Sequence, residues 1–568
     1  MKRRLLLASG LIVLLLLTVS AKLFDLQVIE HPRWLARAQS FQQRKLSVPE
    51  RRGRIYDRHG LLLAADVPAV SIALDNYQMT KPELLKGILQ RQLGLSPERL
   101  DRLIYRPSYF TWIDRQLDWS KAQALRQAVR QAGIQGLIFL DGWKRVYPQG
   151  RLASNVIGFV GVDGHGLEGV ERSFDAELRG SERQLLITAG ARGLEVARQV
   201  LRPGRPGLDL YLTLDARIQQ IAQRAIGQGV RQYRARAGMA LVLDPRSGEL
   251  LAMAQDKTYD LNDYRHSSAL ERKDLALTAP FEPGSAFKPF TMLAALSAGA
   301  VRLNEKFNGN DPVTIGGHPF HNAEHLSYGS VTLSDIITHS INTGMIRVAQ
   351  RLGAKRLGDF LQRLGFGRLT GIGLPGEVPG ILRPPATWSA LGVGATAIGQ
   401  SVSVTGLQLA SRLAMLADGG LLRAPRLVLT LKDASGQELP LPHPTKPPVQ
   451  IASPAQVQAL VAMMERVVRE GTGILAKIPG FAIAAKSGTG QVALPGRGYV
   501  KGRYTAVFEG FFPADRPQYL ILVVLNDPRV RYYYGGDTAA PIFKKIAQGI
   551  IALEHLQPGQ GPGGATPR

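Results

Sequence analysis

The first hydrophobic segment of the chain is also its longest. Leu5–Ala21 contains no charge, follows three basic residues at 2–4 and precedes Lys22. A membrane-spanning helix needs about 17–25 apolar residues, and positive charge before it holds the N-terminus in the cytoplasm. The pattern predicts a cytoplasmic stub at 1–4 and an uncleaved anchor at 5–21. A cleaved signal peptide is the alternative, because Val19-Ser20-Ala21 has the small residues of a cleavage site.

Beyond the anchor, alternating and helical patterns predict a first module over residues 22–205. Val70–Leu74 alternates like a strand, and Trp119–Ala132 has the periodicity of a helix, so we expect an α+β module. Its polar, amphipathic beginning, up to residue 50, is expected to be a linker helix. The Pro- and Gly-rich segment 201–207 is the boundary candidate.

The second region, 206–556, alternates helical and strand-like segments, which indicates an α/β fold class. Asp215 is the expected N-cap of its first helix. The runs 239–243 and 249–253 flank a turn and predict two neighbouring strands. Residues 557–568 are rich in Gly and Pro and are expected to form a flexible tail.

Charge and cysteine content narrow the compartment and the partners. The formal net charge of +25 indicates an anionic partner, such as nucleic acid, a membrane surface or an acidic wall polymer. Because the anchor places most of the chain where there is no DNA, we expect no nucleic-acid partner. The chain has 0 Cys, which excludes a disulfide framework and a thiol nucleophile.

The sharpest candidate for chemistry is Ser285. Pro283 and Gly284 predict a turn and an apolar helical pattern follows, so Ser285 is expected at a helix N-terminus. Lys288 lies three residues later on the same helix face, where its amine can reach Ser285 Oγ. A serine is a poor nucleophile until a base takes its proton, and burial with nearby positive charge makes lysine such a base. A Ser-x-x-Lys spacing alone occurs by chance in most long chains.

Two further motifs make chance a poor explanation. Ser340-Ile341-Asn342 is expected on a turn that ends a helix starting near Thr332. Lys486-Ser487-Gly488-Thr489 follows an alternating run and is expected on a strand. The three motifs, in this order, are the signature of serine acylases that bind penicillin.

With these motifs the chain resembles the class B penicillin-binding proteins over nearly its whole length. The resemblance includes Arg52-Gly53-Arg54-Ile55-Tyr56-Asp57 early in the chain and Tyr534-Gly535-Gly536 near its end. It implies a pedestal (dimerisation-like) domain at 22–205. It also implies a serine β-lactamase/transpeptidase-like domain at 206–556, with helices flanking an antiparallel sheet. The pattern is most similar to the septal cell-division type, penicillin-binding protein 3, while a paralogue or an elongation enzyme stays open.

The resemblance also implies roles for the motif residues. Ser285 attacks a D-Ala-D-Ala peptide stem, and Lys288 is its base. Ser340 bridges Lys288 and Lys486 and passes a proton to the leaving D-Ala, while a charged Lys486 holds the terminal carboxylate. The implied substrate-binding residues are Asn342, Ser487, Gly488 and Thr489.

The implied setting is the bacterial inner membrane, with a single pass and a periplasmic catalytic domain. The expected partners are peptidoglycan stems, β-lactam antibiotics, a membrane glycosyltransferase and division proteins, and no cofactor is expected. Two alternatives stay open: a D,D-carboxypeptidase or β-lactamase-like hydrolase, and a non-catalytic scaffold or β-lactam sensor. For the hydrolase, Glu282 is a candidate deacylating base, although a first-turn charge that favours the helix dipole is the simpler interpretation.

One group of possible metal ligands lies outside the three motifs. His318, His321, Glu324 and His325 occur close together in the sequence. A metal site needs three or four such ligands to converge, and Pro319 with its neighbouring glycines favours a loop instead. We therefore expect a solvated or hydrogen-bonded loop and no metal site.

Overall fold

The computed structural model describes residues 2–35, 43–189, 195–442, 446–494 and 498–558. The chain forms two compact units, each built from several segments. Unit 1 consists of residues 1–52, 68–143 and 179–207, and unit 2 of residues 53–67, 144–178 and 208–568. The chain crosses from unit 1 to unit 2 for the last time after Gly207, and two segments of the expected domain 22–205, 53–67 and 144–178, cluster with unit 2. The predicted tail, 557–568, lies outside the described residues from 559 onward.

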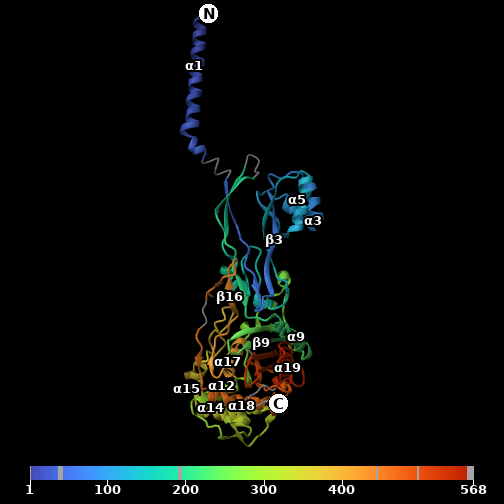
Figure 1. Ribbon diagram of the computed structural model, residues 1–568, viewed down its shortest axis with the longest axis vertical. Coiled ribbons are helices and arrows are strands. Elements are labelled where there is room, and N and C mark those ends of the chain that lie inside the picture. Colours follow the sequence, from blue (N-terminus) through green and yellow to red (C-terminus); the bar gives the residue numbers. More distant parts are fainter. Residues whose placement is uncertain (1, 36–42, 190–194, 443–445, 495–497, 559–568) are drawn as a thin grey trace, which may run out of the picture. The chain divides into compact units, whose positions relative to one another are not determined.

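The N-terminal helix has the length that the apolar run predicts. Helix α1 (Lys2–Phe24) continues into a π-helical segment, Asp25–Ile29 (Figure 1). Within the described part of the chain, this is the one helix long and apolar enough to cross a membrane. The expected linker helix up to residue 50 is wrong in its last part, because Gln43–Val48 forms strand β1. Residues 36–42 of that expected helix lie outside the described residues.

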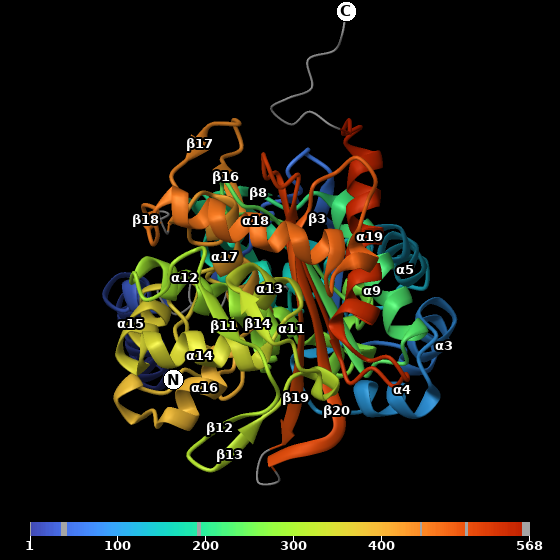
Figure 2. The same cartoon turned by 90° about the horizontal axis from the view of Figure 1, so that it is seen from below.

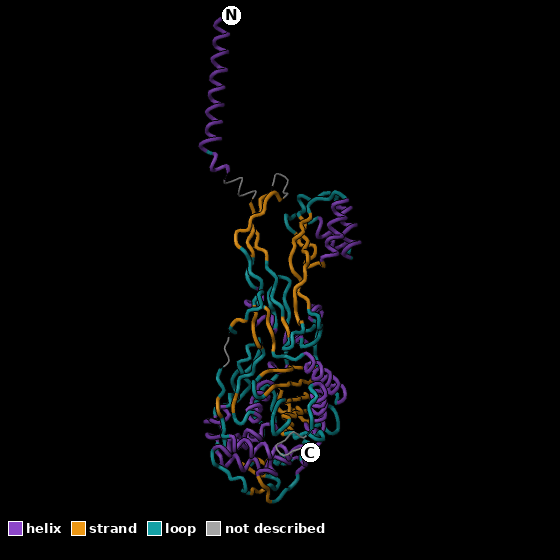
Figure 3. The backbone as a smooth tube through the Cα atoms, viewed as in Figure 1, coloured by secondary structure: helices purple, strands orange, loops and turns teal. Residues whose placement is uncertain are grey.

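Unit 1 contains a small sheet and a helical layer. The sheet is antiparallel with the order β1-β6-β7. The helices, purple in Figure 3, bury apolar side chains such as Leu85 and Leu125 in one cluster with Ile72. The elements after β1 are β4 (Thr111–Asp118), β6 (Arg183–Ala189), β7 (Glu195–Arg202), α3 (Pro82–Leu93), α4 (Pro97–Ile104) and α5 (Trp119–Gln131). Strands β3 (Leu62–Leu74) and β5 (Leu137–Val146) each run across a boundary between the units.

Unit 2 is organised around a five-stranded antiparallel sheet with the order β10-β9-β21-β20-β19. Helix α9 (Ala216–Gln232) is capped by Asp215, whose side chain accepts hydrogen bonds from the backbone N–H groups of Arg217 and Ile218, as predicted. The sheet strands are β9 (Ala237–Asp244), β10 (Glu249–Gln255), β19 (Ala484–Leu494), β20 (Gly498–Phe512) and β21 (Tyr519–Asn526).

Helices cover both faces of this sheet, which explains why its central strands are apolar on both sides. On β20, Phe508 and Phe512 join the core under α9 and α19, whereas Val507 and Phe511 join the core under α12 and α17. Figure 2 shows these helices on opposite sides of the sheet. The covering helices are α9 (Ala216–Gln232), α12 (Lys288–Ser297), α17 (Gly406–Ala417), α18 (Pro454–Glu470) and α19 (Gly535–Leu553).

The early segments of unit 2 belong to it because they pair with its later strands. In a second sheet, β2 pairs with β3 antiparallel and with β8 parallel, and β16 continues from β8 to β17. The short strands are β2 (Ile55–Tyr56), β8 (Asp209–Leu212), β11 (Lys306–Asn308), β12 (Val313–Ile315), β13 (His318–Phe320), β14 (Ser330–Thr332), β15 (Leu421–Leu422), β16 (Val428–Lys432), β17 (Glu438–Leu439) and β18 (Val449–Gln450).

The remaining helices of this part are short and connect the elements around the motif residues. The α-helices are α6 (Ser154–Ile157), α7 (Gly169–Ser173), α8 (Asp175–Arg179), α10 (Ala269–Arg272), α11 (Leu275–Thr278), α13 (Leu333–Thr338), α14 (Asn342–Leu352), α15 (Ala354–Arg363) and α16 (Ala390–Ala397). The 3₁₀ helices are η2 (Leu261–His266), η3 (Gly284–Phe287), η4 (Ala323–His325), η5 (Pro385–Thr387) and η6 (Ile474–Ala476).

Candidate active site

Ser285 lies on the 3₁₀ turn η3, which leads directly into α12, as the turn and helix pattern predicts. The backbone of strand β19 packs directly against the backbone of this turn. Gly284 has φ +54°, and a Cβ there would lie 2.3 Å from Thr489 O. A Cβ on Gly488 would lie 2.5 Å from Pro283 O. Because only glycine permits this approach, the third motif is held directly beside the candidate nucleophile.

Lys288 is completely buried, and its amine is directed at the second motif. Nζ donates to Ser340 O at 2.5 Å, to Ser340 Oγ at 3.2 Å and to Asn342 Oδ1 at 2.7 Å. Among the described residues it makes no hydrogen bond to Ser285 Oγ, so the expected direct contact is absent from this conformation. Catalytic hydrogen bonds of a substrate-free enzyme are often long and tighten when substrate binds.

Ser340 lies on the turn between α13 and α14, as predicted, in a left-handed conformation with φ +59°. Such a conformation costs a non-glycine residue about 1–3 kcal/mol, so the surrounding contacts must hold it. Its Oγ lies 3.2 Å from Lys288 Nζ and 3.0 Å from Lys486 Nζ. Asn342 was expected on the same turn, but it is the first residue of α14, because Ile341 occupies the N-cap position.

Lys486 lies on β19 and is as buried as Lys288. Burial and the charge of Lys486 together hold the pKa of Lys288 well below its ordinary value, which favours the uncharged amine that a general base needs. Burial also lowers the pKa of Lys486, to about 7, although Glu509 opposes the shift. This shift runs against the expectation that Lys486 stays charged, which remains a prediction.

Glu509 is the charged residue of this site that the sequence analysis missed. It is the register partner of Lys486 across β19 and β20 and is fully buried. Neither of its carboxyl oxygens has a hydrogen-bond partner among the described residues. Burial raises the pKa of Glu509 well above its ordinary value, and the nearby Lys486 only partly counters this. A single acidic residue in the apolar run 505–512 was the available signal.

The other third-motif side chains are oriented by residues that the sequence analysis did not assign to the site. Ser487 Oγ lies 2.7 Å from Thr472 Oγ1. Thr489 Oγ1 accepts a hydrogen bond from the backbone N–H of Gly535 at 3.2 Å. Gly535 belongs to a segment that contributed to the family resemblance, whereas no motif pointed to Thr472.

Glu282 makes contacts that neither expected role describes. Its Oε1 accepts hydrogen bonds from the Ser401 backbone N–H and the Tyr499 hydroxyl, both at 2.9 Å. Burial raises the pKa of Glu282, against the lowering effect of these two donors. The Glu282 carboxylate is therefore held by the segment after α16 and by the start of β20, and does not stand free as a base.

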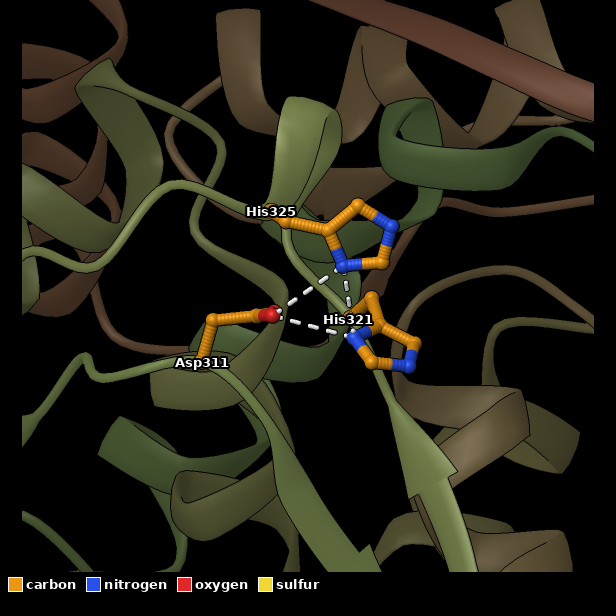
Figure 4. A group of neighbouring side chains, drawn as sticks. All are labelled: Asp311, His321 and His325. Carbon is orange, nitrogen blue, oxygen red and sulfur yellow. Dashed lines mark hydrogen bonds and ion pairs between the residues drawn. The ribbon is translucent and has the colours of Figure 1, made fainter.

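Hydrogen bonds hold the histidine loop, which is one of the two forms expected for it. His321 and His325 direct their rings at Asp311, a residue that the sequence analysis had not singled out (Figure 4). His318 instead packs edge-on against Phe320, with ring centroids 5.4 Å apart. The three side chains of Figure 4 could together hold a metal ion.

Two models of protein families match the chain, one over each of its two parts. The family model of the penicillin binding protein transpeptidase domain matches residues 238–548. The family model of the penicillin-binding protein dimerisation domain matches residues 47–212.

Individual relatives match almost end to end. A Pseudomonas aeruginosa protein named "Probable peptidoglycan D,D-transpeptidase PbpC" is 32% identical over 98% of this chain and 96% of its own. Peptidoglycan D,D-transpeptidase FtsI of Escherichia coli is 30% identical over 97% and 92%. The crystal structure of penicillin-binding protein 3 from Mycobacterium tuberculosis with ampicillin, 28% identical, superposes with a TM-score of 0.71 over 91% of this chain and 98% of that one. The chain therefore belongs to the class B penicillin-binding protein family.

Proposed function

We propose that the protein is a peptidoglycan D,D-transpeptidase that cross-links cell-wall peptide stems in septal synthesis during cell division. The acyl-enzyme forms on Ser285, and β-lactams acylate the same residue. The observation that carries this proposal is the position of Ser340 Oγ between the buried amines of Lys288 and Lys486. The names of the relatives, and the ampicillin complex of a structural neighbour, support it.

In the acylation step, the uncharged Lys288 amine takes the Ser285 proton as Oγ bonds to the carbonyl carbon of the penultimate D-Ala. Backbone N–H groups of Ser285 and Thr489 stabilise the oxyanion. The proton then passes through Ser340 Oγ to the nitrogen of the leaving D-Ala as the peptide bond breaks. The hydrogen bonds that join Lys288, Ser340 and Lys486 support this route.

In the second step, an amine from a neighbouring stem attacks the acyl carbon and releases Ser285. If water attacks instead, the result is D,D-carboxypeptidase activity, which we assign as a side reaction of the same serine-type mechanism. A dedicated hydrolase needs a base for that water. Glu282 is a poor base because its carboxylate already accepts hydrogen bonds from Ser401 and Tyr499.

The domain assignment and the membrane orientation belong to the same proposal. Residues 1–4 lie in the cytoplasm and 5–21 anchor the chain in the inner membrane. The pedestal, 22–205, and the catalytic domain, 206–556, lie in the periplasm. We expect the pedestal to meet a membrane glycosyltransferase and division proteins, because a cross-linking enzyme works on newly polymerised strands.

The test is to locate the acyl group and identify its acceptor. A labelled penicillin should add one adduct to the peptide that contains Ser285, and Ser285→Ala should remove the adduct without changing the melting temperature. Ser297→Ala, at the end of the helix that follows Ser285, should keep it. With a D-Ala-D-Ala donor and an amine acceptor, the product should be the new amide. An adduct that survives in Ser285→Ala, or a product that is only the hydrolysed donor, would contradict the proposal.

A further inference from the structure

Three side chains from separate elements meet at one point near the second motif. Asp311 precedes β12, while His321 and His325 follow β13, so the β12–β13 hairpin brings them together (Figure 4). Asp311 Oδ2 lies 3.0 Å from His321 Nδ1 and 3.3 Å from His325 Nδ1. The two Nδ1 atoms lie 2.9 Å apart.

Hydrogen bonds alone satisfy this arrangement only in part. A neutral imidazole carries one N–H, so each Nδ1 is either a donor or an acceptor. If both Nδ1 atoms carry a hydrogen, two N–H groups face each other across 2.9 Å. If only one Nδ1 carries a hydrogen, that N–H must be shared between the other ring and the carboxylate. If neither does, three lone pairs converge without a hydrogen. One cation at the centre would engage all three lone pairs.

We propose that Asp311, His321 and His325 form a binding site for a divalent transition-metal ion, with zinc as the reference ion. Two imidazoles and one carboxylate are a donor set that zinc uses, with bonds of about 2.0–2.2 Å and tetrahedral geometry. Those bond lengths place neighbouring ligand atoms about 3.4 Å apart, so the observed separations of 2.9–3.3 Å need to widen only slightly.

The protein holds the three ligands in place and leaves one side open. Asp311 is half-buried as a residue, with only 6% of its side chain exposed, whereas the side chains of His321 and His325 are 40% and 70% exposed. Asp311 Oδ1 accepts a hydrogen bond from the Asn322 backbone N–H at 2.5 Å, which orients the carboxylate. Glu324 and His325 both have left-handed backbones, with φ of 55° and 56°, which turns His325 back toward Asp311. The exposed side leaves room for water to complete the coordination.

The same loop is hydrogen-bonded to the second motif. Asn342 Nδ2 donates to His321 O at 2.7 Å, and the Thr343 backbone N–H donates to Asn322 Oδ1 at 3.0 Å. Asn342 Oδ1 in turn accepts a hydrogen bond from Lys288 at 2.7 Å. A metal ion that fixes His321 would therefore also fix Asn342. This consequence for the acylation rate, unlike the metal site itself, rests on the proposed function.

The test uses the full-length protein in detergent, without an affinity tag and after treatment with a chelator. Zinc titration should give one ion per chain, and cobalt should give the visible absorption of a tetrahedral site. His321→Ala and His325→Ala should weaken zinc binding by more than about 100-fold, beyond the typical loss from an outer-shell change. His318→Ala, from the same loop but outside the cluster, should bind like the wild type. No stoichiometric binding, or equal binding by a His321→Ala/His325→Ala double variant, would overturn the site.

The link to Asn342 has its own readout. Zinc should raise the rate of penicillin acylation by about 3-fold in the wild type, the effect of roughly one neutral hydrogen bond, and should leave His325→Ala unchanged. Zinc binding without any change in the wild-type rate would overturn the link. If the wild type is not acylated at all, the proposed function fails, while the zinc titration still decides the metal site.

Discussion

The residues around Ser340 are held in two different ways. On one side, the buried group of Lys288, Lys486 and Glu509 lies entirely out of solvent on α12, β19 and β20. On the other, the loop group of residues 308–330 is largely exposed and is held by hydrogen bonds between side chains and the backbone. Loss of water controls which buried groups carry charge. In the loop group, solvent screens charges and hydrogen bonds decide where atoms lie.

The largest effect should come from removing the base of the buried group. Lys288→Ala should slow acylation by every β-lactam by about 10²–10⁴-fold, the usual cost of losing a proton-transfer group. Alkaline pH should not restore the rate, because no other group replaces the amine. Lys355→Ala, an exposed lysine on α15, is the matched control. Stopped-flow acylation rates, with melting curves to check folding, would refute the assignment if the loss were under 10-fold.

A second prediction concerns the charge of the Lys486 amine and its role in holding the substrate carboxylate. Lys486→Ala should slow acylation by a penicillin about 10–100-fold, the value of a hydrogen bond to a charged group, and should affect its carboxylate methyl ester much less. Since the pKa of Lys486 is about 7, the charge is present below that pH and lost above it. The wild-type preference for the acid should therefore decline between about pH 6 and 8. Equal losses for both ligands would instead assign Lys486 to proton transfer.

A third prediction concerns the effect of the buried Glu509 carboxyl on the stability of the folded protein. Its raised pKa means that the folded state keeps a proton that the unfolded state releases above about pH 4.5. Its contribution to stability is therefore complete at low pH and is lost as pH rises toward the folded-state pKa. Glu509→Gln cannot ionise, so its melting temperature should exceed the wild-type value by about 2–4 °C, with a gap that widens from pH 5 to 8.

The exposed Glu438→Gln is the control for Glu509→Gln and should show no such trend. A wild type that is the more stable protein at pH 8 would mean that Glu509 is ionised and paired with Lys486. In that case the carboxyl stabilises the buried group instead of straining it.

The smallest effect should come from the loop group. Asn322 donates to Gly309 O and Leu326 O and accepts a hydrogen bond from the Thr343 N–H. Asn322→Ala should lower the acylation rate by about 3-fold, because it loosens the backbone that positions Asn342. Asn310→Ala, which removes a contact only to Gly329, should leave the rate unchanged. The measurement is the rate of penicillin acylation in both variants. A loss in Asn322→Ala as large as that in Lys288→Ala would show that the buried group and the loop group act as one unit.

Features that depend on neighbouring residues could be predicted from the sequence alone. The turn and helix at Ser285, the N-cap at Asp215 and the strand that carries Lys486 all follow from local patterns. The apolar run at 5–21 predicted helix α1 in the same way. Turns, caps and alternation are decided by residues a few positions apart, so they can be recognised in the sequence.

The contacts that give the site its chemistry were decided only by the tertiary structure. Ser340 meets Lys486 across 146 positions, and Glu509 faces Lys486 because of the register of β19 with β20. Asp311 reaches His321 only through the β12–β13 hairpin. No local pattern encodes such pairings, because strand register and helix packing depend on which distant apolar surfaces are buried together. The same burial lowers the pKa of Lys486, which is why its charge near neutral pH could not be predicted from the motif.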